Sequence, residues 1–300
     1  MKDIIYDYII AGSGIAGNVC AYELSRNNKS CLILEKENTR KEKVCGGGVP
    51  SEALDLLRMI DIDVDSFVQQ NDVSKIYGDT FNFIDTKLEH EYTSYNYSLG
   101  TKREIFDEFL LRQALKVGAS IKYGQQVKSI KTSNGLFIVN GYKCRKFVSA
   151  IGARGFDNKI PKEQSVGISA QIRGESDLKD DRFYFWYYEK TKDKYFWIFP
   201  IGNMLWNIGI WYRHPNKNMR KEYELCIHRI LNNHFKDGFI YEICPKGEFL
   251  GNVNQISTIT NWYGIGDFVG TNNIKNGGGI FYAIESAINF ARDEIKFSYN

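Results

Sequence analysis

The pattern of hydrophobic positions near the N-terminus predicts the start of an α/β fold. An apolar strand at residues 8–11 is followed by a helix at residues 16–25 and by a second apolar strand at residues 31–34. A strand, a helix and a second strand in this order are typical of a βαβ unit with a parallel sheet.

The middle of the chain predicts a helix and then a small antiparallel meander. Residues 101–118 carry an apolar stripe at helical spacing, and a Thr-x-x-Glu capping box is expected at residues 101–104. Two Asn-Gly pairs, at 134–135 and 140–141, are typical of tight hairpin turns. We expect them to separate three short strands within residues 127–150.

From residue 165 the hydrophobic period becomes two, which is the period of β-strands. Four segments predict antiparallel strands: VGISAQI, RFYFWYYEK, YFWIFPIG and MLWNIGIWYR. A sheet buried on one face should alternate apolar and polar residues, but FYFWYY does not. We therefore expect its second face to meet a ligand, another layer or a partner, and we expect residues 218–235 to form a helix that covers the sheet.

The C-terminal segment predicts a strand, a sharp turn at Gly266-Asp267 and a long helix. A glycine triplet at residues 277–279 precedes this helix. Its apolar residues recur at i, i+3, i+4 and i+7 from Ile280 to Ile295, which is the spacing of one buried helix face.

Composition and charge narrow the class of protein. The 300 residues include 39 basic and 36 acidic side chains, and the resulting net charge of +3 does not suggest a nucleic-acid partner. No apolar run reaches the roughly 20 residues of a membrane helix, and the N-terminus leads directly into a strand, which is unlike a signal peptide. The six cysteines form no CxxC pair, so we expect neither a metal site nor a disulfide framework. We expect a reduced, cytoplasmic protein.

Glycines at the first strand–helix junction predict a nucleotide site. Gly12, Gly14 and Gly17 form a G-x-G-x-x-G motif. The first glycine permits a tight turn, the second lets a pyrophosphate approach, and the third lets the helix pack on the strand. Glu35 ends the second strand, where an acidic side chain accepts hydrogen bonds from an unphosphorylated ribose. This pattern favours FAD or NAD over NADP.

The C-terminal segment favours FAD. Asp267 follows a strand and can hold a ribityl hydroxyl. A helix that begins near Gly278, Gly279 and Ile280 can stabilise negative charge near flavin N1 through its N-terminus. Residues 43–50, KVCGGGVP, raise a further question, because three consecutive glycines form either a flexible loop or a place where backbone lies close to a ligand.

Together these motifs resemble the geranylgeranyl reductase family of FAD-dependent oxidoreductases, within the p-hydroxybenzoate hydroxylase-like flavoprotein superfamily. The resemblance covers essentially the whole chain, and it is carried by GSGIAG…E, KVCGGG, TKREIFDEFLLRQALKVGA, YFWIFPIG and GIGDFVG…GGGI. It implies an α/β fold in which a discontinuous, Rossmann-like FAD-binding domain is interrupted by an antiparallel β-sheet substrate domain.

The expected FAD-binding domain comprises residues 1–70, 101–158 and 255–300, and the expected substrate domain comprises residues 71–100 and 159–254. Members of the family typically continue beyond the final flavin helix. The resemblance therefore implies a chain shortened at the C-terminus, which acts on a shorter substrate or on one presented by a partner.

The resemblance also implies site residues. Cys45, Gly46 and Gly47 would line the flavin, where Cys45 either donates a proton or shapes the pocket, although a plain packing role explains it equally well. Arg103, an unfavourable cation in a first helical turn, would contact the FAD pyrophosphate. The predicted cofactor contacts are Gly12, Gly14, Gly17, Glu35, Lys36, Cys45, Gly46, Gly47, Arg103, Val127, Gly152, Gly266, Asp267, Gly278, Gly279 and Ile280. The predicted substrate pocket contains Trp197 and Phe199, and an aromatic lining suits an apolar or aromatic small molecule.

These residues leave several functions open. We favour a reductase, in which reduced flavin delivers hydride to a carbon–carbon double bond, Cys45, a tyrosine or water supplies the proton, and NAD(P)H or an external reductase supplies electrons. A monooxygenase acting on an aromatic ring needs the same fold, but the usual Asp-Gly fingerprint is replaced by Arg154-Gly155. A halogenase is disfavoured because Tyr195 and Phe199 depart from the Trp-x-Trp-x-Ile-Pro signature. The intact glycine loops argue against a non-catalytic flavin-binding protein.

Overall fold

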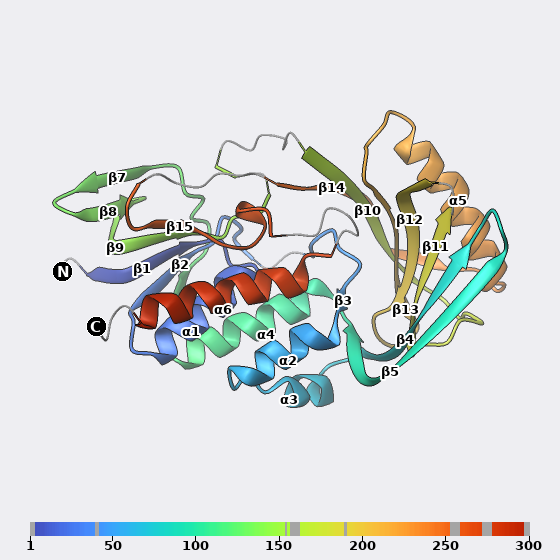
Figure 1. Cartoon of the computed structure of the whole chain (residues 1–300), viewed down its shortest axis with the longest axis horizontal. Helices are drawn as coiled ribbons and strands as arrows, with labels where there is room; N and C mark the ends of the chain where they lie inside the picture. Colours follow the sequence, from blue (N-terminus) through green and yellow to red (C-terminus); the bar gives the residue numbers. More distant parts are fainter. Residues whose placement is uncertain are drawn as a thin grey trace.

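A computed structural model of the chain shows two β-sheets at opposite ends of the molecule, with a layer of helices beside the first sheet (Figure 1). The structure describes residues 4–39, 42–153, 155–156, 163–188, 191–252, 259–271 and 278–296. Arg154 and Gly277, on which two of the sequence arguments rest, lie outside the described residues.

The first sheet has the strand order β6-β2-β1-β9-β8-β7, and β15 pairs with β9. Its strands are β1 (Ile5–Ala11), β2 (Cys31–Leu34), β6 (Ser120–Lys122), β7 (Ile130–Ser133), β8 (Leu136–Val139), β9 (Tyr142–Ser149) and β15 (Trp262–Gly264). Strand β1 is parallel to both β2 and β9. The predicted βαβ unit and the predicted meander β7-β8-β9 are both confirmed.

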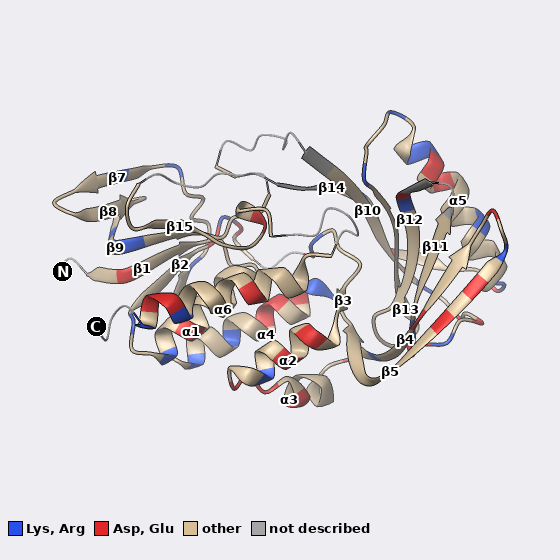
Figure 2. Ribbon diagram, in the orientation of Figure 1, with Lys and Arg blue, Asp and Glu red and all other residues tan. Residues whose placement is uncertain are grey.

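Helices cover one face of this sheet. They are α1 (Ile15–Arg26), α2 (Ser51–Met59), α3 (Val64–Gln70), α4 (Arg103–Lys116) and α6 (Ile280–Lys296). Ile10, Val19, Leu110 and Ile284 are fully buried in the shared core, which joins the sheet to both ends of the chain. Positions of both charge signs are interspersed over the helix layer (Figure 2). None of the helices described is both long and apolar enough to cross a bilayer.

The second sheet has the order β14-β10-β13-β12-β11-β4-β5-β3, and its neighbours are antiparallel except for β4 and β11. Its strands are β3 (Gly48–Val49), β4 (Ser74–Phe83), β5 (Leu88–Gly100), β10 (Glu163–Arg173), β11 (Arg182–Tyr188), β12 (Thr191–Pro200), β13 (Leu205–Tyr212) and β14 (Ile240–Asn252). The predicted antiparallel sheet is thus confirmed, with one parallel pair that the sequence pattern did not indicate.

Both faces of the second sheet are aromatic because each meets a different layer. On β12, Phe196 and Ile198 point to the core beneath α5 (Met219–His234), while Trp197 and Phe199 point to the opposite face. Helix α5 is the predicted helix at residues 218–235, and Figure 1 shows it on the outer side of the sheet. The opposite face, which carries Trp197 and Phe199, meets the loop around Gly46 and Gly48.

The short strand β3 belongs to the second sheet, although it lies in the segment expected in the FAD-binding domain. Gly48 pairs with Gly100 and Val49 pairs with Leu99 of β5. The chain therefore reaches across to the second sheet directly after the cysteine-glycine stretch and returns in α2 (Figure 1). The domain boundaries themselves remain a prediction.

The N-terminus of α4 differs from the prediction. The expected Thr-x-x-Glu capping box does not form, because Lys102 is the N-cap and Thr101 is fully buried at the end of β5, where its hydroxyl donates to the Lys102 carbonyl. The cap comes instead from a distant loop, where the carboxylate of Glu42 accepts hydrogen bonds from the N–H groups of Arg103 at 3.1 Å and Glu104 at 3.3 Å.

Candidate functional site

The G-x-G-x-x-G motif forms the predicted turn between β1 and α1. Gly12 has a φ of +101°, and a Cβ there would lie only 2.5 Å from the carbonyl oxygen of Ala150. A Cβ on Gly17 would overlap the carbonyl of Gly12. Gly14 is the N-cap of α1, where no described side chain caps the helix and no acidic residue occupies the first turn. The first-turn N–H groups therefore suit an anionic ligand.

A lysine that the sequence analysis missed lies over this turn. The Nζ of Lys43 is 2.8 Å from the place that a Cβ on Gly14 would take, and it lies 3.4 Å from the buried carboxylate of Asp107. A glycine turn, an uncapped helix N-terminus and an adjacent cation together fit a pyrophosphate. The signal was present in the sequence, because Lys43 opens the KVCGGG stretch.

Glu35 is held at the end of β2 by the backbone. One carboxylate oxygen accepts the N–H of Ser13 at 2.8 Å and the other accepts the N–H of Glu37 at 3.0 Å. Each oxygen keeps lone-pair capacity for a ribose hydroxyl. Next to it, Lys36 lines a surface cavity of about 520 Å³. Val127 is partly buried and packs against the core of the first sheet.

The C-terminal motif meets the N-terminal one. Gly266 has a φ of +62°, and a Cβ there would lie 2.9 Å from the Cβ of Ala16 in the first turn of α1. Half-buried Asp267 follows it in a single 3₁₀ turn, η1 (Gly266–Phe268). Helix α6 begins at Ile280, and the carbonyl of Gly279 accepts the N–H of Ala283 at 2.9 Å. The chain ends are thus brought together as the motif predicts.

For two of the predicted cofactor contacts, Gly152 and Gly278, the structure gives only their position in the chain fold. Gly152 has a φ of +80°, follows Ala150 and Ile151 beside the glycine turn, and has open space where a Cβ would stand. Gly278 directly precedes Gly279 at the start of α6 and is exposed. Both stay predictions.

Arg103 has a protein partner for its charge. Its guanidinium donates to both carboxylate oxygens of Asp107, at 3.1 and 3.2 Å, and it also contacts the side chain of Cys45. Burial alone lowers the pKa of Arg103, but the attraction of Asp107 and Cys45 outweighs burial, and the pKa is raised above its usual range. The predicted role at the FAD pyrophosphate stays a prediction, whereas the contact with Cys45 places a cation beside the thiol.

The three glycines after Cys45 are packed on protein atoms. A Cβ on Gly46 would lie 2.8 Å from Cε2 of Phe199, and one on Gly48 would lie 3.1 Å from Cζ of Phe183. Gly47 has a φ of +76°, and its Cβ would overlap the carbonyl of Thr101. Residues 45–48, which we call the cysteine loop, thus fit between the start of α4 and the aromatic face of the second sheet only because they lack side chains.

Hydrogen bonds tie the cysteine loop to the second sheet. The carbonyl oxygen of Cys45 accepts the side-chain N–H of Asn207 at 2.7 Å and the hydroxyl of Ser169 at 3.2 Å. The carboxamide oxygen of Asn207 in turn accepts the indole N–H of Trp197 at 2.8 Å. Neither Asn207 nor Ser169 belongs to a recognised motif, so neither could be predicted as a site residue from the sequence.

Trp197 and Phe199 lie together on the sheet face that meets the cysteine loop. Both are buried, and they pack with Phe183, Trp211 and partly buried Tyr195. Burial raises the pKa of the Tyr195 hydroxyl above its usual range, and the nearby Cys45 raises it further. Tyr195 therefore keeps its proton at neutral pH. Both residues lie beside the cysteine loop, and their place in a substrate pocket stays a prediction.

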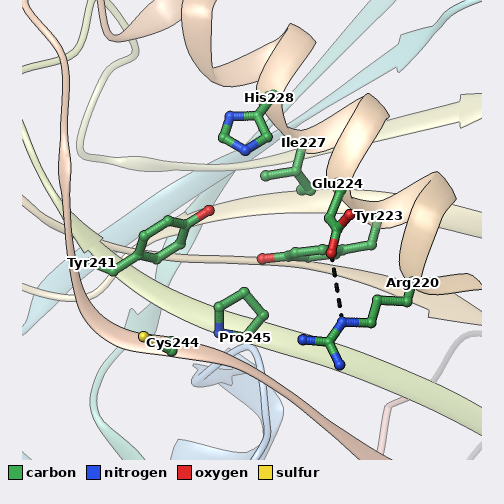
Figure 3. Close-up of a pocket in the computed structure, with 8 residues that line it drawn as sticks. All are labelled: Arg220, Tyr223, Glu224, Ile227, His228, Tyr241, Cys244 and Pro245. Atoms are coloured by element: carbon green, nitrogen blue, oxygen red, sulfur yellow. Dashed lines mark ion pairs between the residues drawn. The ribbon is translucent and has the colours of Figure 1, made fainter.

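A separate cavity lies on the other side of the second sheet. Figure 3 shows that α5 and β14 supply its lining, with the hydroxyls of Tyr223 and Tyr241 turned toward one another. Its volume is about 280 Å³, and its lining residues are Arg220, Tyr223, Glu224, Ile227, His228, Tyr241, Cys244 and Pro245. Because α5 covers the face opposite to Trp197, this cavity is not the predicted substrate pocket.

Comparisons with known proteins point to the same cofactor class. A family model described as "FAD binding domain" matches residues 6–135. Digeranylgeranylglycerophospholipid reductase 3 of Methanosphaera stadtmanae is 24% identical over 94% of this chain and 75% of its own length. The crystal structure of a geranylgeranyl bacteriochlorophyll reductase-like protein from Thermoplasma acidophilum matches with a TM-score of 0.80 at 20% identity, over 98% of this chain and 79% of that one.

The chain thus carries an FAD-binding domain and is similar over nearly its whole length to reductases of the geranylgeranyl reductase type. A mutant of the halogenase PltM, solved in complex with FAD, has a TM-score of 0.79 at 16% identity and covers 99% of this chain and 70% of its own. The predicted cofactor, FAD, is confirmed, and the glycine turn, Lys43 and Glu35 are the residues of this chain that fit its pyrophosphate and ribose. The likeness to the halogenase reflects the shared fold.

Proposed function

We propose that this protein reduces a carbon–carbon double bond of an apolar small molecule. The observation that supports the proposal most directly is the position of the cysteine loop, which lies between the flavin-binding motifs and the aromatic face around Trp197. Relatives support it by name, including the geranylgeranyl diphosphate reductase of Rhodobacter capsulatus, which is 26% identical over 45% of this chain. Such names specify prenylated substrates, which are long and apolar.

Bound FAD supplies hydride chemistry, and the residues of the chain supply position and a proton. Trp197 and Phe199 offer an apolar surface beside the cysteine loop for the alkene. The sulfur of half-buried Cys45 accepts the N–H of Gly47 at 3.5 Å, which holds it at the loop. The thiol of Cys45 would give its proton to one alkene carbon as bound FAD supplied hydride to the other, and the sulfur would then take a proton back from water.

Arg103 suits this role of Cys45. Its buried guanidinium contacts the thiol side chain and stays charged because Asp107 binds it on the other side. A fixed cation beside Cys45 attracts the negative charge that proton donation leaves there. The electrons for each turnover would come from NAD(P)H or from an external reductase.

The test is a single turnover without oxygen. FAD-loaded protein is photoreduced and mixed with geranylgeranyl diphosphate or with digeranylgeranylglycerophospholipid, and products are analysed by mass spectrometry. We expect a product heavier by two hydrogens and one equivalent of reoxidised flavin. Cys45→Ala should slow this step at least tenfold while leaving FAD bound. Reduced flavin that stays reduced with both probes would reject a prenyl substrate.

A further inference from the structure

We propose that Asn207 is a positioning residue that couples the substrate face to the cysteine loop, an inference that rests on the proposed function of that loop. Asn207 lies on β13 and is 2% exposed, between Trp197 and the carbonyl of Cys45. Its side chain is the only link in the described structure that binds both of these groups by side-chain hydrogen bonds.

The chemistry of its partners determines how the carboxamide is oriented. An indole N–H can only donate and a peptide carbonyl can only accept. The oxygen of Asn207 therefore faces Trp197 at 2.8 Å, and its nitrogen faces Cys45 at 2.7 Å. A flipped amide would place oxygen against oxygen and two donors against each other. The carboxamide of Asn207 thus has a single orientation. In that orientation its nitrogen can donate only if the Cys45 carbonyl stays at its present position.

The cysteine loop can move little once the Cys45 carbonyl is held by its hydrogen bonds. Ser169 donates to the same oxygen at 3.2 Å and lies 3.4 Å from the carboxamide oxygen of Asn207. A trans peptide directs the N–H of Gly46 away from the carbonyl of Cys45, so the anchor also fixes which side of this peptide faces away from the sheet. Gly46 itself is pressed against the Phe199 ring. A ligand that moves Trp197 would therefore pull on the hydrogen bond from Asn207 to the Cys45 carbonyl.

Isosteric substitutions separate the two hydrogen bonds. Asn207→Asp keeps an acceptor for the Trp197 indole but sets a carboxylate oxygen against the Cys45 carbonyl. Trp197→Phe removes the indole N–H that donates to Asn207, but the side-chain N–H of Asn207 can still donate to the Cys45 carbonyl. Asn82→Asp is the matched control, because Asn82 also donates to a backbone carbonyl of the second sheet, that of Phe185 at 3.4 Å, away from the loop.

The measurement is the alkylation rate of Cys45 by iodoacetamide in the FAD-loaded protein, resolved by peptide mass spectrometry. Exposed Cys244 is the internal reference, and buried Cys20 and Cys144 report global loosening. Alkylation that depends on local opening follows the population of the open loop. We expect Asn207→Asp to raise the Cys45/Cys244 rate ratio about tenfold, the effect of one lost hydrogen bond. Trp197→Phe should raise it about threefold, and Asn82→Asp should leave it unchanged.

An unchanged ratio in Asn207→Asp would overturn the proposal, as would an equal rise at Cys20 and Cys144, which indicates a general structural role. If Asn207→Asp fails to fold, Trp197→Phe decides alone, and an unchanged ratio there overturns the proposal. The readout does not require alkene reduction. A changed thiol rate in a protein that reduces no alkene would therefore leave the positioning role standing and reject the reductase function.

Discussion

At the scale of single residues, the glycines of the cysteine loop show how one pattern can serve two purposes. Three consecutive glycines suggest backbone lying near a ligand, and the structure shows that protein atoms alone already exclude side chains. Phe199 crowds Gly46, and the carbonyl of Thr101 crowds Gly47. The aromatic face and the helix start are therefore sufficient reason for the glycines on one side of the loop.

Gly46→Ala should lower the free energy of unfolding by about 1–3 kcal/mol, the usual cost of forcing a methyl group into a packed site. The methyl group would stand 2.8 Å from the Phe199 ring. Gly247→Ala is the matched control, because Gly247 lies in a strand and the nearest atom to its Cβ would be at 3.8 Å. Urea unfolding of both variants measures the difference, and equal stabilities would contradict the packing described here.

The sequence allowed us to predict site residues that belong to a short motif. It did not allow us to predict residues whose contacts lie far away along the chain. The spacing of Gly12, Gly14 and Gly17 and the place of Glu35 follow from one short segment of chain. Asn207 meets Cys45 across 162 residues, and no pattern near either residue announces the contact. Such partners follow from the packing of the two sheets, which the sequence alone does not specify.

At the scale of elements, α4 shows why a local helix signal can fail. Thr101 and Glu104 have the spacing of a capping box, but Thr101 directly follows the last residue of β5 and is fully buried, with its N–H donating to the Gly47 carbonyl. The orphan N–H groups then need another acceptor, and Glu42 reaches them from the loop before the cysteine. The cap of α4 is thus coupled to the chain segment that carries Cys45.

This cap predicts a pH dependence of stability. Burial raises the pKa of Glu42 above its ordinary value of 4.5, although the two backbone hydrogen bonds partly offset burial. A raised folded pKa means that the Glu42 contribution is fully present below pH 4.5 and is lost as the pH rises through the folded pKa. The free energy of unfolding of the wild type, relative to that of Glu42→Gln, should therefore fall as the pH rises above 4.5. Urea unfolding at several pH values measures it, and a difference that rises with pH would contradict the assignment.

Helix α6 is fastened to the first sheet by a buried polar contact. The hydroxyl of Tyr8 donates to the carboxylate of Glu294 at 2.6 Å, and Lys146 pairs with the same carboxylate. Tyr8→Phe should cost about 1–2 kcal/mol of unfolding free energy, because a buried acceptor loses its donor. Tyr6→Phe, on the same strand, is the control and should change stability by less. Equal losses in thermal unfolding would show that the contact contributes nothing specific.

At the scale of the whole molecule, the two sheets have separate tasks, and the cysteine loop connects them. The first sheet and its helices assemble the nucleotide motifs from both ends of the chain, as the periodicities predict. The second sheet divides its aromatic residues between α5 and the side that meets Cys45. The parallel pairing of β4 with β11, and the place of β3 in this sheet, arise from long connections that leave no periodic signal.

The measurement that tests the proposed reduction most directly follows the fate of oxygen and of solvent protons in one turnover. Photoreduced, FAD-loaded protein is mixed with geranylgeranyl diphosphate in heavy water that contains ¹⁸O₂, and the product is analysed by mass spectrometry. We predict a saturated bond that carries two carbon-bound deuteriums and no ¹⁸O, because the N5–H of reduced flavin and the thiol proton both exchange with solvent before transfer. A product that carries one atom of ¹⁸O would contradict it and would make the protein an oxygenase.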